Sequence, residues 1–107
     1  MQRVLGILIS VGLSIVVWAG ETISEGRLAK GTKWETPFFV RLSDQNGPTV
    51  VITGGIHGDE PAGARAAEQI RHWPITRGRL VVIPQANIPG LRDGTRFLPG
   101  EPPSRRD

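Results

Sequence analysis

The chain has 107 residues, which leaves room for one small domain, and 13 basic against 10 acidic side chains give it a formal net charge of +3. This excess is small and forms no basic stripe, which argues against nucleic acid as a partner. The sequence contains no cysteine, so disulfide bonds and thiolate metal sites are excluded.

The N-terminal residues 1–19 are strongly hydrophobic. Arg3 precedes an apolar run from Val4 to Ala19. This run is shorter than the roughly 20 residues of a membrane-spanning helix, and it has the features of a secretory signal peptide, with Ala19 at the cleavage position. We therefore expect a hydrophobic N-terminal helix that serves as a signal peptide or as an uncleaved membrane anchor through residues 4–19, and a protein that is exported. A cytosolic chain with this helix buried is the alternative.

The next segments predict a linker and a first strand. Residues 20–36 mix charges with glycine and show little apolar periodicity, which is typical of an irregular linker. Residues 37–42 (PFFVRL) predict a strand, and the turn-forming residues 43–48 (SDQNGP) connect it to the following strand, most simply as a hairpin. We expect residues 37–107 to form the N-terminal part of an α/β domain.

The central stretch predicts a βαβ unit. Thr49–Thr53 is apolar and β-branched without polar alternation, as in a parallel strand that is buried on both faces. Two glycines follow, and a helix with apolar residues at helical spacing starts at Pro61. Residues 79–84 (RLVVIP) predict a second strand. Because such crossovers are right-handed in nearly all proteins, the two strands should be parallel.

His57 and Glu60 lie at the carboxyl end of the first of these strands, where open α/β sheets bind ligands. An imidazole and a carboxylate are two of the three protein ligands that a catalytic zinc usually takes. Zinc lowers the pKa of a bound water to about 7 and polarises carbonyl groups, which makes amide hydrolysis feasible. The alternative is a polar turn in which Glu60 caps the helix and His57 has no role. Asp59 either caps the helix or orients His57.

The ten residues Gly54–Gly63 (GGIHGDEPAG) resemble the zinc-binding signature of the succinylglutamate desuccinylase/aspartoacylase family, relatives of the zinc carboxypeptidases. The resemblance extends over residues 47–107. It implies a zinc-carboxypeptidase-like mixed or parallel sheet, and it implies that His57 and Glu60 are two ligands of Zn²⁺. The implied function is zinc-dependent hydrolysis of an amide bond in a small-molecule or peptide substrate that carries a carboxylate.

Later residues extend the resemblance. Asn87 and the step Thr95-Arg96-Phe97 match family positions, and Asp107 matches the first residue of an Asp-Leu-Asn-Arg element. The resemblance implies that Arg96 and Asn87 bind substrate, and a guanidinium fork suits carboxylate or carbonyl oxygens. The family's third zinc ligand, a histidine, and its glutamate general base have no counterpart here. We expect both beyond Asp107, so no catalytic base is assigned within this chain.

Residues 88–107 hold four prolines, three glycines and four arginines, which predicts a long surface loop. The only other histidine, His72, should lie about 18 Å from Glu60 along the helix and cannot reach the same metal. One helix cannot cover both faces of a sheet, so we expect an incomplete domain, the front part of a larger one.

Two other function classes stay open. The first is a phosphate or nucleotide binder, because glycines between a strand and a helix can cradle phosphate. The residues Gly54–Gly58 fit neither nucleotide-binding glycine pattern, and Asp59 and Glu60 would repel an anion. The second is an exported or membrane-tethered, non-catalytic module that binds a metal or another ligand through the same turn.

Overall fold

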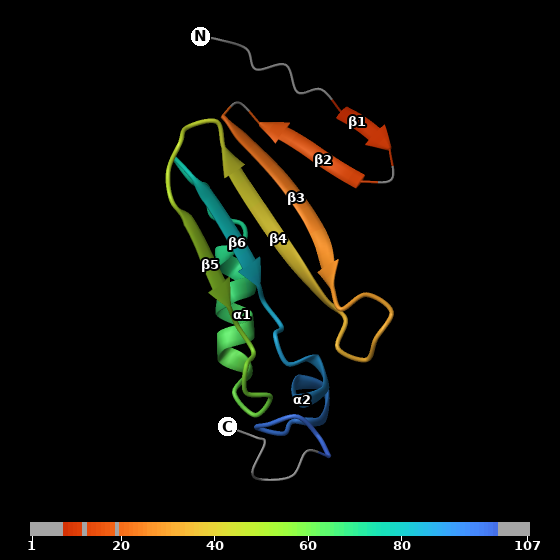
Figure 1. Cartoon of the computed structure of the whole chain (residues 1–107). Helices are drawn as coiled ribbons and strands as arrows, with labels where there is room; N and C mark the ends of the chain where they lie inside the picture. The colour runs from red at the N-terminus through yellow and green to blue at the C-terminus, as the bar shows by residue number, and fades with distance from the viewer. Residues whose placement is uncertain (1–7, 12, 19, 101–107) are drawn as a thin grey trace.

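The computed structural model describes residues 8–11, 13–18 and 20–100, and these residues form one sheet and two helices (Figure 1). The strands follow the order β1-β2-β3-β4-β6-β5 across the sheet. Neighbouring strands are antiparallel except β5 and β6, which are parallel. The elements are β1 (Leu8–Val11), β2 (Leu13–Trp18), β3 (Glu21–Leu28), β4 (Thr36–Ser43), β5 (Thr49–Thr53), α1 (Pro61–Ile70), β6 (Arg79–Ile83) and α2 (Ile88–Asp93).

The expected N-terminal hydrophobic helix is wrong for the described residues. Within residues 4–19, β1 and β2 are strands that pair with each other, and β2 also pairs with β3. Isoleucine and valine recur in both strands, and such β-branched residues favour strands because their χ1 freedom is restricted in a helix. Among the described residues, no helix is long and apolar enough to cross a membrane. The signal peptide or anchor of residues 1–19 stays a prediction.

The irregular linker expected over residues 20–36 is also wrong for much of its length. Strand β3 pairs with β4 from Glu21↔Ser43 to Leu28↔Thr36. Its side chains are half-buried or exposed, so the strand needs no apolar run. The sequence therefore lacked the pattern by which a buried strand is recognised.

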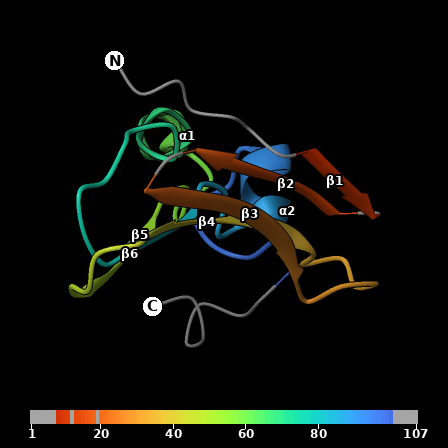
Figure 2. The same cartoon turned by 90° about the horizontal axis from the view of Figure 1, so that it is seen from above.

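The predicted βαβ unit is confirmed. Strands β5 and β6 are parallel, with Thr49 opposite Arg79, and α1 connects them and packs against both. Figure 2 shows α1 on one face of the sheet. The buried core between them is small, and partly buried isoleucines surround it. Its buried hydrophobic residues are Ala67, Leu80 and Val82, with Ile52, Ile70 and Ile75 around them.

The hairpin predicted between residues 37–42 and Thr49–Thr53, which are β4 and β5 in the structure, is wrong because β6 lies between these two strands. Residues 43–48 therefore cross over β6 instead of forming a tight turn. Strand β5 is the last strand of the described sheet, and Val50 and Val51 are 49% and 58% exposed. The prediction that β5 is buried on both faces is therefore wrong in this chain. Ile52 is the residue of β5 that packs against the core.

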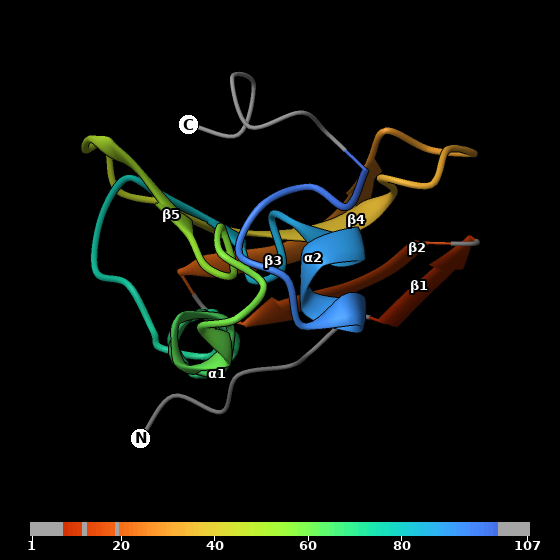
Figure 3. The same cartoon turned by 90° about the horizontal axis from the view of Figure 1, so that it is seen from below.

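Helix α2 lies within the segment that the sequence predicts to be a loop. Asn87 is its N-cap, a proline occupies its first turn, and Gly94 ends it with φ of 68°. These are ordinary start and stop signals, but six residues are too few for apolar periodicity to show. Figure 3 looks onto the carboxyl ends of β5 and β6, where α2 and the β5–α1 loop lie in front of the sheet.

Candidate functional site

The site is built from the loops that follow β5 and β6. Backbone hydrogen bonds join these loops at close intervals. They are Gly54 N to Ile83 O (2.9 Å), Ala86 N to Gly54 O (2.8 Å), Asn87 N to Gly55 O (2.9 Å) and Gly58 N to Arg96 O (3.3 Å). Because these bonds begin at the last residues of two adjacent strands, the sheet fixes where both loops start.

Two glycines let the loops approach each other. Gly55 has φ of 65°, in the left-handed region that favours glycine. Gly58 has no room for a side chain, because a Cβ there would overlap with the backbone of Gly90 and Thr95. Gly55, the second residue of the predicted double glycine, therefore allows the backbone conformation of the turn, and Gly58 allows the backbone-to-backbone packing.

His57 and Glu60 are brought together as the sequence predicts. His57 Nδ1 lies 3.2 Å from Glu60 Oε2, and their side chains are 34% and 60% exposed. Glu60 occupies the N-cap position of α1 but makes no side-chain cap hydrogen bond. Its carboxylate contacts His57 instead. Glu60 therefore occupies the N-cap position, as the alternative predicts, but its side chain does not cap the helix.

Arg96 comes to the same carboxylate from the segment that follows α2. Its Nη1 lies 2.6 Å from Glu60 Oε1 and 3.7 Å from Asp59 Oδ1. Glu60 thus divides its two oxygens between a guanidinium and an imidazole. The structure places Asp59, predicted to cap α1 or to orient His57, beside Arg96. Its negative charge therefore adds to the attraction that holds the guanidinium here.

The pKa of the Glu60 carboxyl is lowered from its usual value, first by the hydrogen bond from Arg96 and then by the one with His57. Replacing Arg96 with alanine should therefore raise this pKa back towards its ordinary value. A ¹³C NMR titration of the Glu60 carboxyl with chelator present measures the change. Arg92→Ala, which removes the arginine that pairs with Asp93, is the control and should leave the Glu60 pKa where it is. An unchanged pKa in Arg96→Ala would contradict the observed pairing.

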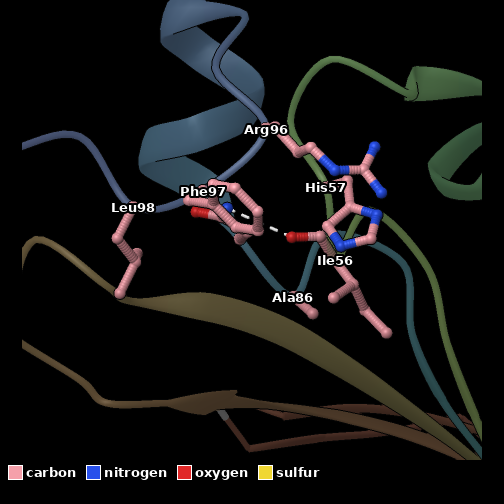
Figure 4. Close-up of a pocket in the computed structure, with 7 residues that line it drawn as sticks. Ile56, His57, Ala86, Arg96, Phe97 and Leu98 are labelled. Carbon is pink, nitrogen blue, oxygen red and sulfur yellow. Dashed lines mark hydrogen bonds between the residues drawn. The ribbon is translucent and has the colours of Figure 1, made fainter. Parts of the chain in front are cut away.

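A pocket of about 460 Å³ opens beside these residues (Figure 4). Figure 4 shows His57 with Arg96 on one side and Ile56 on the other. The Phe97 ring meets the His57 imidazole edge-on, with centroids 6.0 Å apart and an interplanar angle of 86°. The lining residues are Ile56, His57, Ala86, Asn87, Arg96, Phe97 and Leu98. Sequence reasoning missed Ile56, Ala86 and Leu98, because an aliphatic side chain carries no chemical signal of its own.

Asn87, predicted to bind substrate, lines the pocket but is 9% exposed. Its Oδ1 accepts a hydrogen bond from Gly90 N (2.9 Å), and its Nδ2 donates one to Ile56 O (3.1 Å). His72 lies away from the pocket, exposed and 3.8 Å from Glu68, as expected for a residue with no part in the site.

The donor pair fits a zinc ion. Two ligand atoms that bind tetrahedral zinc at about 2.0–2.2 Å lie about 3.3–3.5 Å apart. His57 Nδ1 and Glu60 Oε2 are 3.2 Å apart, a separation that also serves a hydrogen bond. No cluster of three or more metal-binding side chains occurs in the part of the chain that the structure describes. His57 and Glu60 therefore offer two of the three protein ligands that a catalytic zinc usually takes.

Comparison with known proteins gives a consistent result. Residues 46–106 match the family described as succinylglutamate desuccinylase/aspartoacylase catalytic domain. The chain is similar to the N-alpha-acetyl-L-2,4-diaminobutyric acid deacetylase of Halomonas elongata, with 36% identity over 56 residues. This match covers 50% of the chain and 16% of that enzyme.

Solved structures agree. A succinylglutamate desuccinylase/aspartoacylase from Rhodobacter sphaeroides is 30% identical with a TM-score of 0.55, over 72% of this chain and 26% of that one. The product-bound ectoine utilization protein of Ruegeria pomeroyi is 25% identical with a TM-score of 0.58, over 85% and 31%. An aspartoacylase family protein of Mesorhizobium loti is 25% identical with a TM-score of 0.61, over 86% and 32%. The chain thus spans less than a third of each of these structures.

Proposed function

This chain belongs to the succinylglutamate desuccinylase/aspartoacylase family, and on that premise we propose that it forms part of a zinc-dependent deacylase. The reaction is hydrolysis of the amide bond in a small N-acylated substrate that carries a carboxylate. The observation that carries this proposal is that Glu60 contacts both His57 and Arg96, and that His57 and Arg96 line one pocket. The deacetylase of Halomonas elongata, an enzyme named for an N-acetylated amino acid, supports the substrate class.

His57 and Glu60 are the residues that would hold the zinc. Binding through Nδ1 requires a neutral imidazole that carries its hydrogen on Nε2. The lowered pKa of Glu60 keeps its carboxylate charged, as a ligand must be. Zinc bound here would supply a Lewis acid and a water of lowered pKa. Among the described residues, no third metal-binding side chain joins this pair.

Arg96 is the substrate-binding residue in this proposal. Its planar guanidinium presents several N–H donors in a fixed geometry that suits carboxylate and carbonyl oxygens, and it lines the pocket. Ile56, Phe97 and Leu98 form apolar walls around the place where such an oxygen would lie.

Zinc binding tests the proposal directly. We expect the wild-type chain to bind about one zinc, and we expect the His57→Ala, Glu60→Ala double variant to lose at least about tenfold in affinity, since even outer-shell partners are worth that much. Competition with a coloured chelator measures both values.

The matched control is His72→Ala with Glu68→Ala. Like the site variant, it removes one histidine and one glutamate that lie close together. Glu68 is in α1, His72 follows its C-terminal end, and the two side chains are 3.8 Å apart. This variant should keep the wild-type affinity. If the site variant also binds zinc as the wild type does, the proposed ligands are wrong.

A further inference from the structure

Asn87 holds the loop that carries His57. Its backbone N–H donates to Gly55 O (2.9 Å) and its side-chain Nδ2 donates to Ile56 O (3.1 Å). These are the carbonyls of the two residues that directly precede His57. The remaining polar atom of the side chain, Oδ1, accepts from Gly90 N (2.9 Å) and so caps α2. One buried side chain therefore ties α2 to the loop.

The Ile56 side chain adds little to this contact. The Ile56 side chain is 58% exposed, so its packing does not fix the peptide that leads to His57. On the other side of His57, Gly58 N donates to Arg96 O (3.3 Å) and Gly58 packs against Gly90. The peptide groups that flank His57 are thus fastened to the same region, the start of α2 and the segment that follows it.

An amide is the side chain that this position needs. It must accept one hydrogen bond and donate another in opposite directions, which a carboxylate cannot do because it only accepts. Gly90 leaves room for it, since a Cβ at that residue would overlap with the Asn87 amide. Asparagine at this site is therefore more than an ordinary helix cap, for which aspartate or serine serves equally well.

We propose that Asn87 is a positioning residue, which holds His57 towards Glu60 by fixing the Ile56 carbonyl, and that it is not a direct ligand of the substrate. This inference rests on the proposed role of His57 as a zinc ligand. It revises the role implied by sequence resemblance, because both polar groups of the amide are already engaged within the protein.

Two variants separate the cap from the loop contact. Asn87→Asp and Asn87→Ser both keep an oxygen that caps α2, and both remove the Nδ2 donor. The control is Thr36→Val, which removes another buried hydrogen bond from a side chain to a backbone carbonyl, Thr36 Oγ1 to Gln85 O (2.7 Å). Thr36 is 3% exposed, it lies in β4, and its hydroxyl donates to Gln85 O and not to the loop that carries His57.

Two readouts are measured on the whole chain. Hydrogen exchange of the Gly58 amide, followed by NMR, reports on the loop without any metal. We expect exchange to be at least about tenfold faster in both Asn87 variants and unchanged in Thr36→Val. Zinc affinity should fall by about tenfold in the Asn87 variants, the lower end of the loss seen for outer-shell partners, and should hold in Thr36→Val.

The outcomes are distinct. Unchanged Gly58 exchange in both Asn87 variants would overturn the inference, whatever the zinc result. Faster exchange with unchanged zinc affinity would show that the loop contact does not position a ligand, and would overturn it too. Unfolding of both variants would show a role in the fold as a whole and would equally overturn it. If the wild type shows no zinc binding at His57 and Glu60, the proposed function fails, while the exchange result still decides whether Asn87 holds the loop.

Discussion

Replacing Gly58 with alanine is expected to lower the free energy of unfolding by about 3 kcal/mol or more, at the upper end of the cost of overpacking. The added Cβ would overlap with the Gly90 backbone and with Thr95 O, and backbone atoms cannot move aside as a side chain can. The two loops would have to separate, which would also stretch the hydrogen bond from Gly58 N to Arg96 O. Because His57 precedes Gly58, zinc affinity should fall together with stability.

Urea unfolding followed by circular dichroism measures this effect. Gly63→Ala is a matched control, because it makes the same change five residues further along, inside α1. Outside the helix, a new Cβ there would meet only Gly55 N, at 3.7 Å, which is ordinary van der Waals contact. Alanine favours a helix over glycine by roughly 0.5–1 kcal/mol, so this control should be slightly stabilised. Equal stability of Gly58→Ala and the wild type would contradict the close packing of the two loops.

Removing the Glu21 carboxylate should cost about 3 kcal/mol, the loss expected when one partner of a buried ion pair is deleted. Glu21 Oε2 pairs with Arg41 Nη1 at 2.8 Å, and both side chains are 12% exposed. Glu21 Oε1 also accepts from Ile75 N at 2.9 Å. Arg41 in turn donates to the carbonyls of Arg71 (2.8 Å) and His72 (3.0 Å), at the end of α1. Glu21→Ala would leave the guanidinium largely buried without its counter-charge.

The midpoint of urea unfolding again gives the measurement, with Glu25→Ala as the control. Glu25 is on the same strand, β3, and is exposed, so its replacement should change stability by no more than about 0.5 kcal/mol. A loss of similar size in both variants would show that strand propensity, and not the pair with Arg41, accounts for the effect. The network joins β3, β4 and the end of α1, so Glu21→Ala tests whether β3 belongs to the folded unit.

The network around Arg41 also illustrates what sequence reasoning could not find. Glu21 lies in a segment whose mixed composition predicts a linker, and nothing local marks it as the partner of an arginine 20 residues away. Asn87 is a similar case. The resemblance drew attention to the right residue, but the contact between its Nδ2 and Ile56 O joins residues 31 apart and was visible only in the folded chain.

The sequence by itself determined the central βαβ unit and the pairing of His57 with Glu60. Both depend on neighbouring residues: a β-branched run, two glycines, a proline at the start of a helix, and two polar side chains three residues apart across one turn. These features depend only on residues that are close together in the sequence, so the sequence pattern is enough to predict them. The family resemblance then pointed to zinc and to amide hydrolysis.

The tertiary structure alone decided the strand order, the place of β3 and the position of Arg96. The insertion of β6 between β4 and β5 depends on hydrogen bonds between backbone groups. These groups are chemically the same in every strand, so they do not specify which strand pairs with which. Arg96 reaches Glu60 because the segment that follows α2 turns back to the β5–α1 loop, where Gly58 N donates to Arg96 O. Contacts of this kind depend on how distant segments pack, and a single sequence holds no local signal for them.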